Sequence, residues 1–153
     1  MPKLTHQLIR LALVAGVAAA ASLANVAEAR SAIALDSAVF VERASQQRGR
    51  LLEPAARLSR GDRVVYVLNW TRQAGSGGFV VTNPLPRTVY YQDSASEDAE
   101  VSVDGGRTWG NLDQLRIGSR TATPEDVTHV RWRVPASLAA QGSGQIAYSA
   151  IVR

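Results

Sequence analysis

Side chains that could catalyse a reaction or hold a metal are scattered along this sequence rather than grouped. His129 is the only histidine after residue 30, and no second histidine accompanies it to form a metal site. A serine nucleophile on a Gly-x-Ser-x-Gly elbow is also absent from the sequence. Because His129 alternates with Arg131 and Arg133, we expect it on the solvent-facing side of a strand. The sequence therefore predicts no catalytic, cofactor-binding or metal-binding residue and indicates that the protein is not an enzyme.

Carboxylates are concentrated in one segment, residues 93–100, which contains Asp93, Glu97, Asp98 and Glu100. Carboxylate oxygens are ligands that Ca²⁺ prefers, but the spacing of these four does not fit an EF-hand loop. A run of acidic and small residues is typical of a solvated loop. We expect a solvated loop here, with calcium binding as the alternative.

The segment from Ser102 to Trp109 has the spacing Ser-x-Asp-x-Gly-x-Thr-Trp, which is known as an Asp box from sialidase-like propellers. The Asp104 carboxylate can accept backbone N–H groups in a turn, Gly106 permits a positive φ, and Trp109 can pack beneath a hairpin. A propeller needs several blades of about 40 residues each, so one box cannot indicate a propeller here. We expect Asp104 to organise a turn, and neither Asp104 nor Trp109 to contact a ligand.

The tripeptide Arg60-Gly61-Asp62 is the one that integrins recognise. A three-residue match is a weak signal for adhesion. Gly-Asp is also a turn sequence, and it stands directly before a strand-forming run. We expect a turn here, with adhesion as the alternative.

The run 63–71 is the strand around which the other predicted elements are arranged. Alternation puts one set of large apolar side chains on a single face: Val64, Tyr66, Leu68 and Trp70. Val65 and Val67 make the opposite face largely apolar as well. We therefore expect this strand to be central in its sheet and covered on both sides.

Further strands are predicted by the same alternation, and turn signals separate them. They are expected at 32–42, 79–82, 87–92, 101–103, 127–134 and 145–153, with an edge strand or irregular segment at 51–58 around Pro54. Roughly seven to nine strands at this spacing are typical of an antiparallel sandwich. Trp132 lies on the apolar face of its strand with Val130 and Val134, so we expect it in the core between two sheets.

The first 29 residues have the features of a secretory signal peptide. Lys3 and Arg10 precede an apolar run at 11–23, and Ala27-Glu28-Ala29 is a small-x-small cleavage site. The apolar run is shorter than the ~20 residues of a membrane-spanning helix. We predict an exported protein, periplasmic or extracellular, with one domain at 30–153; an uncleaved N-terminal anchor and cleavage after Ala24 are the alternatives.

Composition limits how this domain can be stabilised and what it can bind. Cysteine is absent, so an exported chain must rely on packing instead of disulfides. After residue 29 there are 15 arginines, no lysine and 12 acidic residues, a net charge of +3. The arginines are spread along the chain without the basic stripe and interleaved aromatics of a nucleic-acid-binding surface. We therefore predict no nucleic-acid partner.

Several segments in order resemble a bacterial immunoglobulin-like domain, the domain-of-unknown-function family numbered eleven, which occurs as repeats in surface proteins. The matching segments are Gly61-Asp62, Val64 to Asn69, Val80-Val81-Thr82-Asn83-Pro84-Leu85-Pro86, Val103-Asp104-Gly105-Gly106 and Ile146 to Val152. Arg60 and Asn83 depart from the family's usual Pro and Asp. The resemblance implies an all-β, immunoglobulin-like antiparallel β-sandwich of the cell envelope, and it implies no catalytic residues.

Two functions are compatible with these observations. The first is a secreted, non-enzymatic module with a structural or protein-interaction role, whose partners are envelope or surface proteins. The alternative is a small periplasmic or extracellular protein that binds a soluble ligand or a glycan.

The signal peptide generates a direct test. We expect Arg30 to be the first residue of the exported protein, because Ala27-Glu28-Ala29 follows the short apolar run. Mass spectrometry of the exported chain measures this, and an intact Met1 would contradict it.

Overall fold

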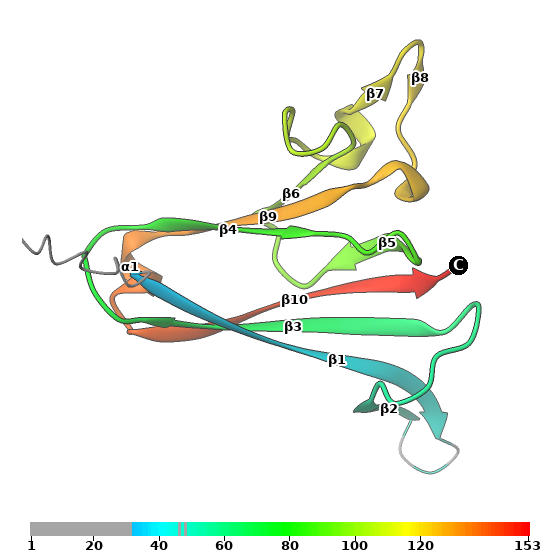
Figure 1. Cartoon of the computed structure of the whole chain (residues 1–153), viewed down its shortest axis with the longest axis horizontal. Helices are drawn as coiled ribbons and strands as arrows, with labels where there is room; N and C mark the ends of the chain where they lie inside the picture. The colour runs from blue at the N-terminus through cyan, green and yellow to red at the C-terminus, as the bar shows by residue number, and fades with distance from the viewer. Residues whose placement is uncertain (1–31, 46, 48) are drawn as a thin grey trace, which may run out of the picture.

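The computed structural model describes residues 32–45, 47 and 49–153, and these residues form two antiparallel β-sheets packed face to face (Figure 1). The predicted signal peptide and Arg30 lie outside the described residues. The first sheet has the order β2-β1-β3-β10-β5 and contains β1 (Ile33–Ser45), β2 (Gly49–Pro54), β3 (Arg63–Arg72), β5 (Val89–Ser94) and β10 (Ser143–Val152). The second has the order β4-β9-β6 and contains β4 (Phe79–Pro84), β6 (Ala99–Ser102) and β9 (His129–Val134).

Short elements complete the chain beside the two sheets. They are a small hairpin of β7 (Arg116–Ile117) and β8 (Arg120–Thr121), the 3₁₀ turns η1 (Leu112–Gln114) and η2 (Pro124–Asp126), and the single-turn helix α1 (Ala136–Ala139). No helix in the described part of the chain is long and apolar enough to cross a membrane. The all-β antiparallel sandwich predicted from the sequence is confirmed, with eight strands in its two main sheets.

Successive strands cross between the sheets. The connections β3 to β4, β4 to β5, β5 to β6 and β9 to β10 each pass from one sheet to the other. Such crossings are typical of double-sheet Greek-key sandwiches. The membership in an immunoglobulin-like family that the resemblance implies stays a prediction.

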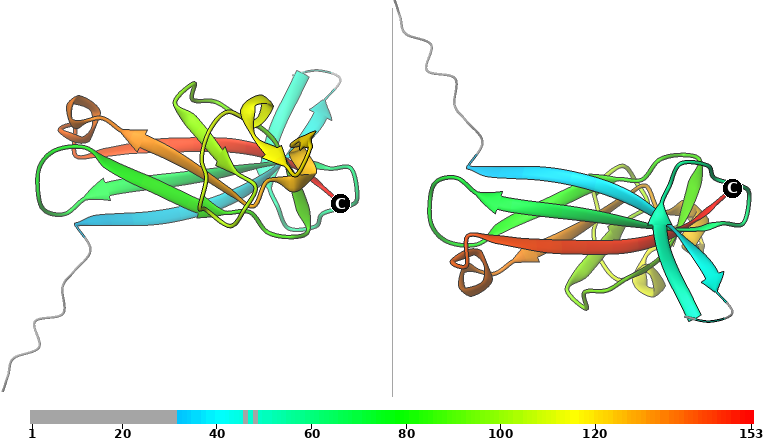
Figure 2. Two further views of the ribbon diagram at one scale, coloured as in Figure 1. Left: turned by 90° about the horizontal axis from the view of Figure 1, so that it is seen from above. Right: turned by 90° about the horizontal axis from the view of Figure 1, so that it is seen from below.

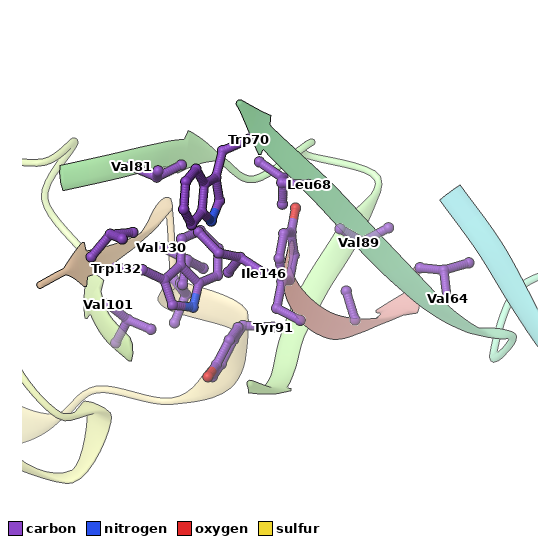
Figure 3. Close-up of a cluster of buried hydrophobic side chains, with 14 of the residues drawn as sticks. Val64, Leu68, Trp70, Val81, Val89, Tyr91, Val101, Val130, Trp132 and Ile146 are labelled. Atoms are coloured by element: carbon purple, nitrogen blue, oxygen red, sulfur yellow. The ribbon is translucent and has the colours of Figure 1, made fainter. Parts of the chain in front are cut away.

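The core lies between the sheets and is built around aromatic side chains (Figure 3). Trp70 on β3 meets Phe79 on β4 edge-to-face, with ring centroids 5.2 Å apart. Trp132 on β9 lies 5.8 Å from the ring of Tyr148 on β10, and its Nε1 donates a hydrogen bond of 3.1 Å to Ser94 Oγ on β5. The prediction that Trp132 lies in the core is therefore confirmed, and β4 and β9 lie above β3 and β10 respectively.

A second polar contact joins the sheets inside this apolar core. The hydroxyl of Tyr148, whose ring stacks on Tyr66 at 4.8 Å, accepts a hydrogen bond of 2.8 Å from Asn83 Nδ2 on β4. Burial, and secondarily the neighbouring Tyr66, raise the pKa of Tyr148 well above its usual range, so its hydroxyl stays protonated. A buried hydroxyl needs such a partner, which Asn83 supplies from the opposite sheet.

The sequence-based description of the central strand needs one correction. β3 is central in its sheet, and Val64, Leu68 and Trp70 are buried as expected. Val65 and Val67 are only partly buried and lie outside the core, because no layer formed by the described residues packs on that face of the sheet. The strand is therefore covered on one side, not on both.

Other boundaries also differ from the predicted ones. β4 continues through Pro84, which is tolerated because β4 is an edge strand. The segment 93–100 is not one loop, since Asp93 belongs to β5 and Glu100 to β6. After the predicted strand 101–103, the chain returns through the Asp-box turn and meets β6 in a single antiparallel bridge between Val101 and Gly110. The predicted edge segment at 51–58 contributes to β2, which is an edge strand.

One glycine is required where the Trp70 indole crosses the neighbouring strand. Gly144 on β10 pairs with Trp70, and a Cβ at Gly144 would lie 2.5 Å from Trp70 Cζ2 and 2.8 Å from its Nε1. These distances are too short for non-bonded atoms, so any side chain at this position must displace the buried indole.

We expect Gly144→Ala to lower the free energy of unfolding by about 1–3 kcal/mol, because the core cannot expand without strain. Urea denaturation measures this loss. Gly110→Ala is the matched control, since its φ is not positive and its Cβ would meet Leu115 at an ordinary 3.6 Å. Equal losses in the two variants would contradict the steric explanation.

Candidate functional site

The Asp-box segment forms a closed turn whose polar groups bind one another. Asp104 Oδ1 accepts hydrogen bonds from Ser102 Oγ (2.8 Å), from the backbone N–H of Arg107 (3.1 Å) and from that of Thr108 (2.9 Å). Ser102 Oγ in turn accepts a bond of 2.9 Å from the backbone N–H of Gly106. Ser102 is completely buried beneath this turn. The predicted role of Asp104 as a turn organiser is confirmed.

Trp109 folds back onto the same turn. Its indole Nε1 donates to the carbonyl oxygen of Gly106 at 2.9 Å, and a Cβ at Gly106, where φ is +89°, would lie 3.4 Å from the ring. The guanidinium of Arg131 lies 4.5 Å from the centre of the indole, within the range of a cation–π contact. Since both the ring and its N–H are engaged within the chain, the packing of Trp109 on the turn is confirmed; whether it contacts a ligand stays a prediction.

His129 lies beside the turn, half-buried rather than fully exposed. Its Nδ1 is 3.0 Å from the hydroxyl of Thr128, which accepts from the backbone N–H of Gly105 at 3.1 Å and donates to the carbonyl of Ser102 at 3.1 Å. Because the only hydroxyl proton is committed to that carbonyl, Nδ1 must carry the ring proton.

A cleft of about 520 Å³ lies next to His129, between the segment 84–87 and η2. Its lining includes Pro84, Pro86, Arg87, Val127, His129 and Arg153. Arg153 is held in place by donating to the carbonyl oxygens of Val89 (3.0 Å) and Glu125 (2.8 Å). The sequence did not indicate this cleft, because its walls come from four parts of the chain that are far apart in the sequence.

The carboxylates of the segment 93–100 do not form a common site. Glu100 pairs with Arg131 at 2.8 Å and with Arg133 at 3.3 Å on the neighbouring strand. The hydrogen bond from Arg131 lowers the pKa of Glu100 below its usual value. Within residues 32–45, 47 and 49–153, no three His, Cys, Asp or Glu side chains are grouped so that they could hold a metal ion. The alternative of a calcium loop at 93–100 therefore receives no support.

The Arg60-Gly61-Asp62 tripeptide forms the predicted turn. Asp62 accepts a hydrogen bond of 2.8 Å from the backbone N–H of Ser59 and pairs with Arg43 at 2.8 Å, which together lower its pKa. Gly61 has a φ of +87°, which favours glycine at this position. The Asp62 side chain is 15% exposed, and its two oxygens are both engaged. The turn is confirmed, and the carboxylate is held by the chain itself.

The solvent face of the first sheet carries a feature that was misread from the sequence. Three adjacent strands place partly exposed apolar side chains side by side, and we call this set the outer patch: Ala38, Phe40, Val65, Val67 and Ala147. Polar groups border it at both ends. Asn69 and Gln145 are joined by a hydrogen bond of 3.0 Å at one end, and Arg63 lies 3.5 Å from Glu42 at the other.

Comparisons with known proteins give no relative. No protein-family model matches the sequence, and neither the curated proteins nor the solved structures contain a significant match.

The Asp-box geometry predicts an acid-sensitive contribution to stability. Hydrogen bonds, first among them the one from Thr108, hold the pKa of Asp104 far below its usual value. A lowered pKa stabilises the fold above the unfolded-state pKa of ~4, and this contribution is lost as the pH falls towards the folded-state value. We expect the melting temperature to be level above about pH 5 and to fall between about pH 4 and 2.

In Asp104→Asn the melting temperature should be several degrees lower at neutral pH, and its fall in acid should be smaller than in the wild type. Asp113→Asn, at an exposed site in η1, is the control and should follow the wild-type curve. Circular dichroism melts across the pH series measure both. An equal fall of the melting temperature in acid for Asp104→Asn and the wild type would show that these hydrogen bonds do not lower the pKa of Asp104.

Proposed function

We propose that this protein is an exported, non-enzymatic β-sandwich module of the bacterial cell envelope, and that it binds another protein through the outer patch. One observation carries the proposal. The middle of the largest sheet has an apolar solvent face with no covering layer in the described part of the chain.

The argument begins with what such a face normally contains. In an antiparallel sandwich the inner faces form the core, and the outer faces carry polar residues. Here the register aligns Phe40 with Val65, and Ala38 with Val67 and Ala147, so the apolar side chains are contiguous across three strands. Contiguous apolar surface of this kind is typical of an interaction site, where its removal from water contributes about 25 cal/mol per Å².

The border of the patch supports the same function. Protein interfaces commonly have an apolar centre and a polar rim. Arg63 lies at the rim, and its buried Nε makes no hydrogen bond, although Glu42 Oε2 is 3.5 Å away. The features of a signal peptide at 1–29 and the resemblance to a surface-protein domain support a location outside the cytoplasm.

A second candidate function rests on the cleft beside His129. Its polar lining, which includes the Arg87 guanidinium and the His129 imidazole, would suit a small anionic or hydroxyl-rich ligand such as a glycan. This function predicts a ligand that raises the melting temperature and that is insensitive to changes in the outer patch.

Site-specific photo-crosslinking tests the proposed function. A photoreactive residue replacing Val67 in the full chain should give a covalent adduct with one protein in the envelope fraction, and the same residue at exposed Thr121 on β8 should not. Val67→Glu, with the photoreactive residue placed at Ala147, should lose the adduct and keep the wild-type melting temperature, since Val67 lies outside the core. Equal adducts from the photoreactive residue at Val67 and at Thr121 would contradict the proposal. So would an adduct from Ala147 that Val67→Glu does not reduce.

A further inference from the structure

The second sheet ends in a strand with an open edge. β4 pairs with β9 on one side, and no described strand pairs with its other side. Leu85 N–H donates to the Thr128 carbonyl at 2.8 Å, which continues the β4–β9 ladder by one pair. Because hydrogen-bonded residues alternate in an antiparallel pair, Val81 and Asn83 also face β9. The N–H and C=O groups of Val80 and Thr82 therefore point away from the sheet.

This edge lacks the devices that usually prevent strand pairing. Native edges are protected by charges, prolines, bulges or a covering loop. β2, an edge of the first sheet, contains Arg50, Glu53 and Pro54, and the edge of β6 is closed by the bridge to Gly110. β4 contains no charged residue, its only proline stands at its last position, and Val80 is 50% exposed.

Beneath the open side of β4 lies an inner surface that no strand of the described chain faces. Trp70 and Phe79 place β4 over β3, so β1 extends the first sheet beyond β4 (Figure 2). Leu35 pairs with the buried Trp70 and shares its inward face, yet Leu35 is 52% exposed. Its exposure follows from the unequal sheets, with five strands below and three above.

We propose that the open edge of β4 accepts an extended segment of a partner protein as a fourth strand of the second sheet. The segment would exchange hydrogen bonds with the backbone of Val80 and Thr82. Its alternate side chains would be apolar and would cover Leu35 from above, across the usual sheet spacing of about 10 Å. A partner of this chemistry is an uncharged, alternating apolar and polar segment of about five residues.

A second copy of the domain does not fit this position. Two β4 strands that paired antiparallel would be related by a twofold axis perpendicular to the second sheet. That axis would pass through the first sheet, because β1 and β3 lie beneath the open side of β4. The first sheet of one copy would then occupy the same space as the first sheet of the other copy. Only a strand without a second layer of its own can bind there.

Selection from a displayed library of random nine-residue peptides, with the full chain as the target, tests this inference. Enriched peptides should alternate apolar and polar residues. Thr82→Pro removes only an outward N–H and should weaken binding of a selected peptide at least tenfold, whereas Thr82→Val keeps that N–H and should change binding by less than about twofold. On binding, amide exchange at Val80 and Thr82 should slow.

A second variant tests the inference even if Thr82→Pro fails to fold. Leu35→Glu changes an exposed side chain, so it should keep the wild-type melting temperature and still weaken peptide binding at least tenfold. Val67→Glu, in the outer patch on the opposite face, should leave peptide binding unchanged, which separates this inference from the proposed function. The inference is overturned if no peptide is enriched, if selected peptides bind Thr82→Pro and Leu35→Glu as they bind the wild type, or if β4 pairs two copies of the chain.

Discussion

The contact between the two sheets is the constraint on which the rest of this structure depends. The chain has no cysteine, so aromatic packing must hold the layers together. Trp70 and Trp132 fill the space from opposite sheets, and two hydrogen bonds between the sheets, from Asn83 to Tyr148 and from Trp132 to Ser94, satisfy polar atoms that this packing buries. Gly144 gives the Trp70 indole the room it needs. The sheets can therefore differ in width and remain joined, because the aromatic residues that join them, Trp70, Phe79, Trp132 and Tyr148, lie on β3, β4, β9 and β10.

That difference in width explains where the molecule offers binding surface. A strand with a partner above it has a buried inner face, as β3 and β10 do. The first half of β1 has no partner above it and leaves Leu35 exposed, and β4, the strand that ends the upper layer, keeps an open edge. The polar motifs that could indicate a binding or catalytic site in the sequence do not offer binding surface, because their side chains bind groups of the same chain. Asp104, Asp62 and Glu100 all bind groups within the chain and stabilise turns or strand pairs.

The sequence predicted the strands better than their arrangement. Period-two alternation located the strand containing Trp132 and its buried face, because that pattern depends on local geometry alone. The same alternation at Val65 and Val67 predicted a covering layer that is absent from the described residues, since a pattern shows that a face is apolar and not what covers it. The Asp-box turn was predictable from a local motif of eight residues, 102–109. The cleft beside His129 and the open edge of β4 were not, because each depends on which sheet a strand joins.

The order of β1, β3 and β10 in the first sheet has a mechanical consequence. β1 and β10 flank β3 and both run antiparallel to it, and the described chain starts at one end of the long axis and finishes at the other (Figure 1). Tension applied to the two ends would pull β1 and β10 in opposite directions along β3. Ladder hydrogen bonds lie perpendicular to the strands, so this force would shear all of them at once rather than open them singly. Force applied between these two ends would therefore be resisted by the whole β1–β3 and β3–β10 ladders together.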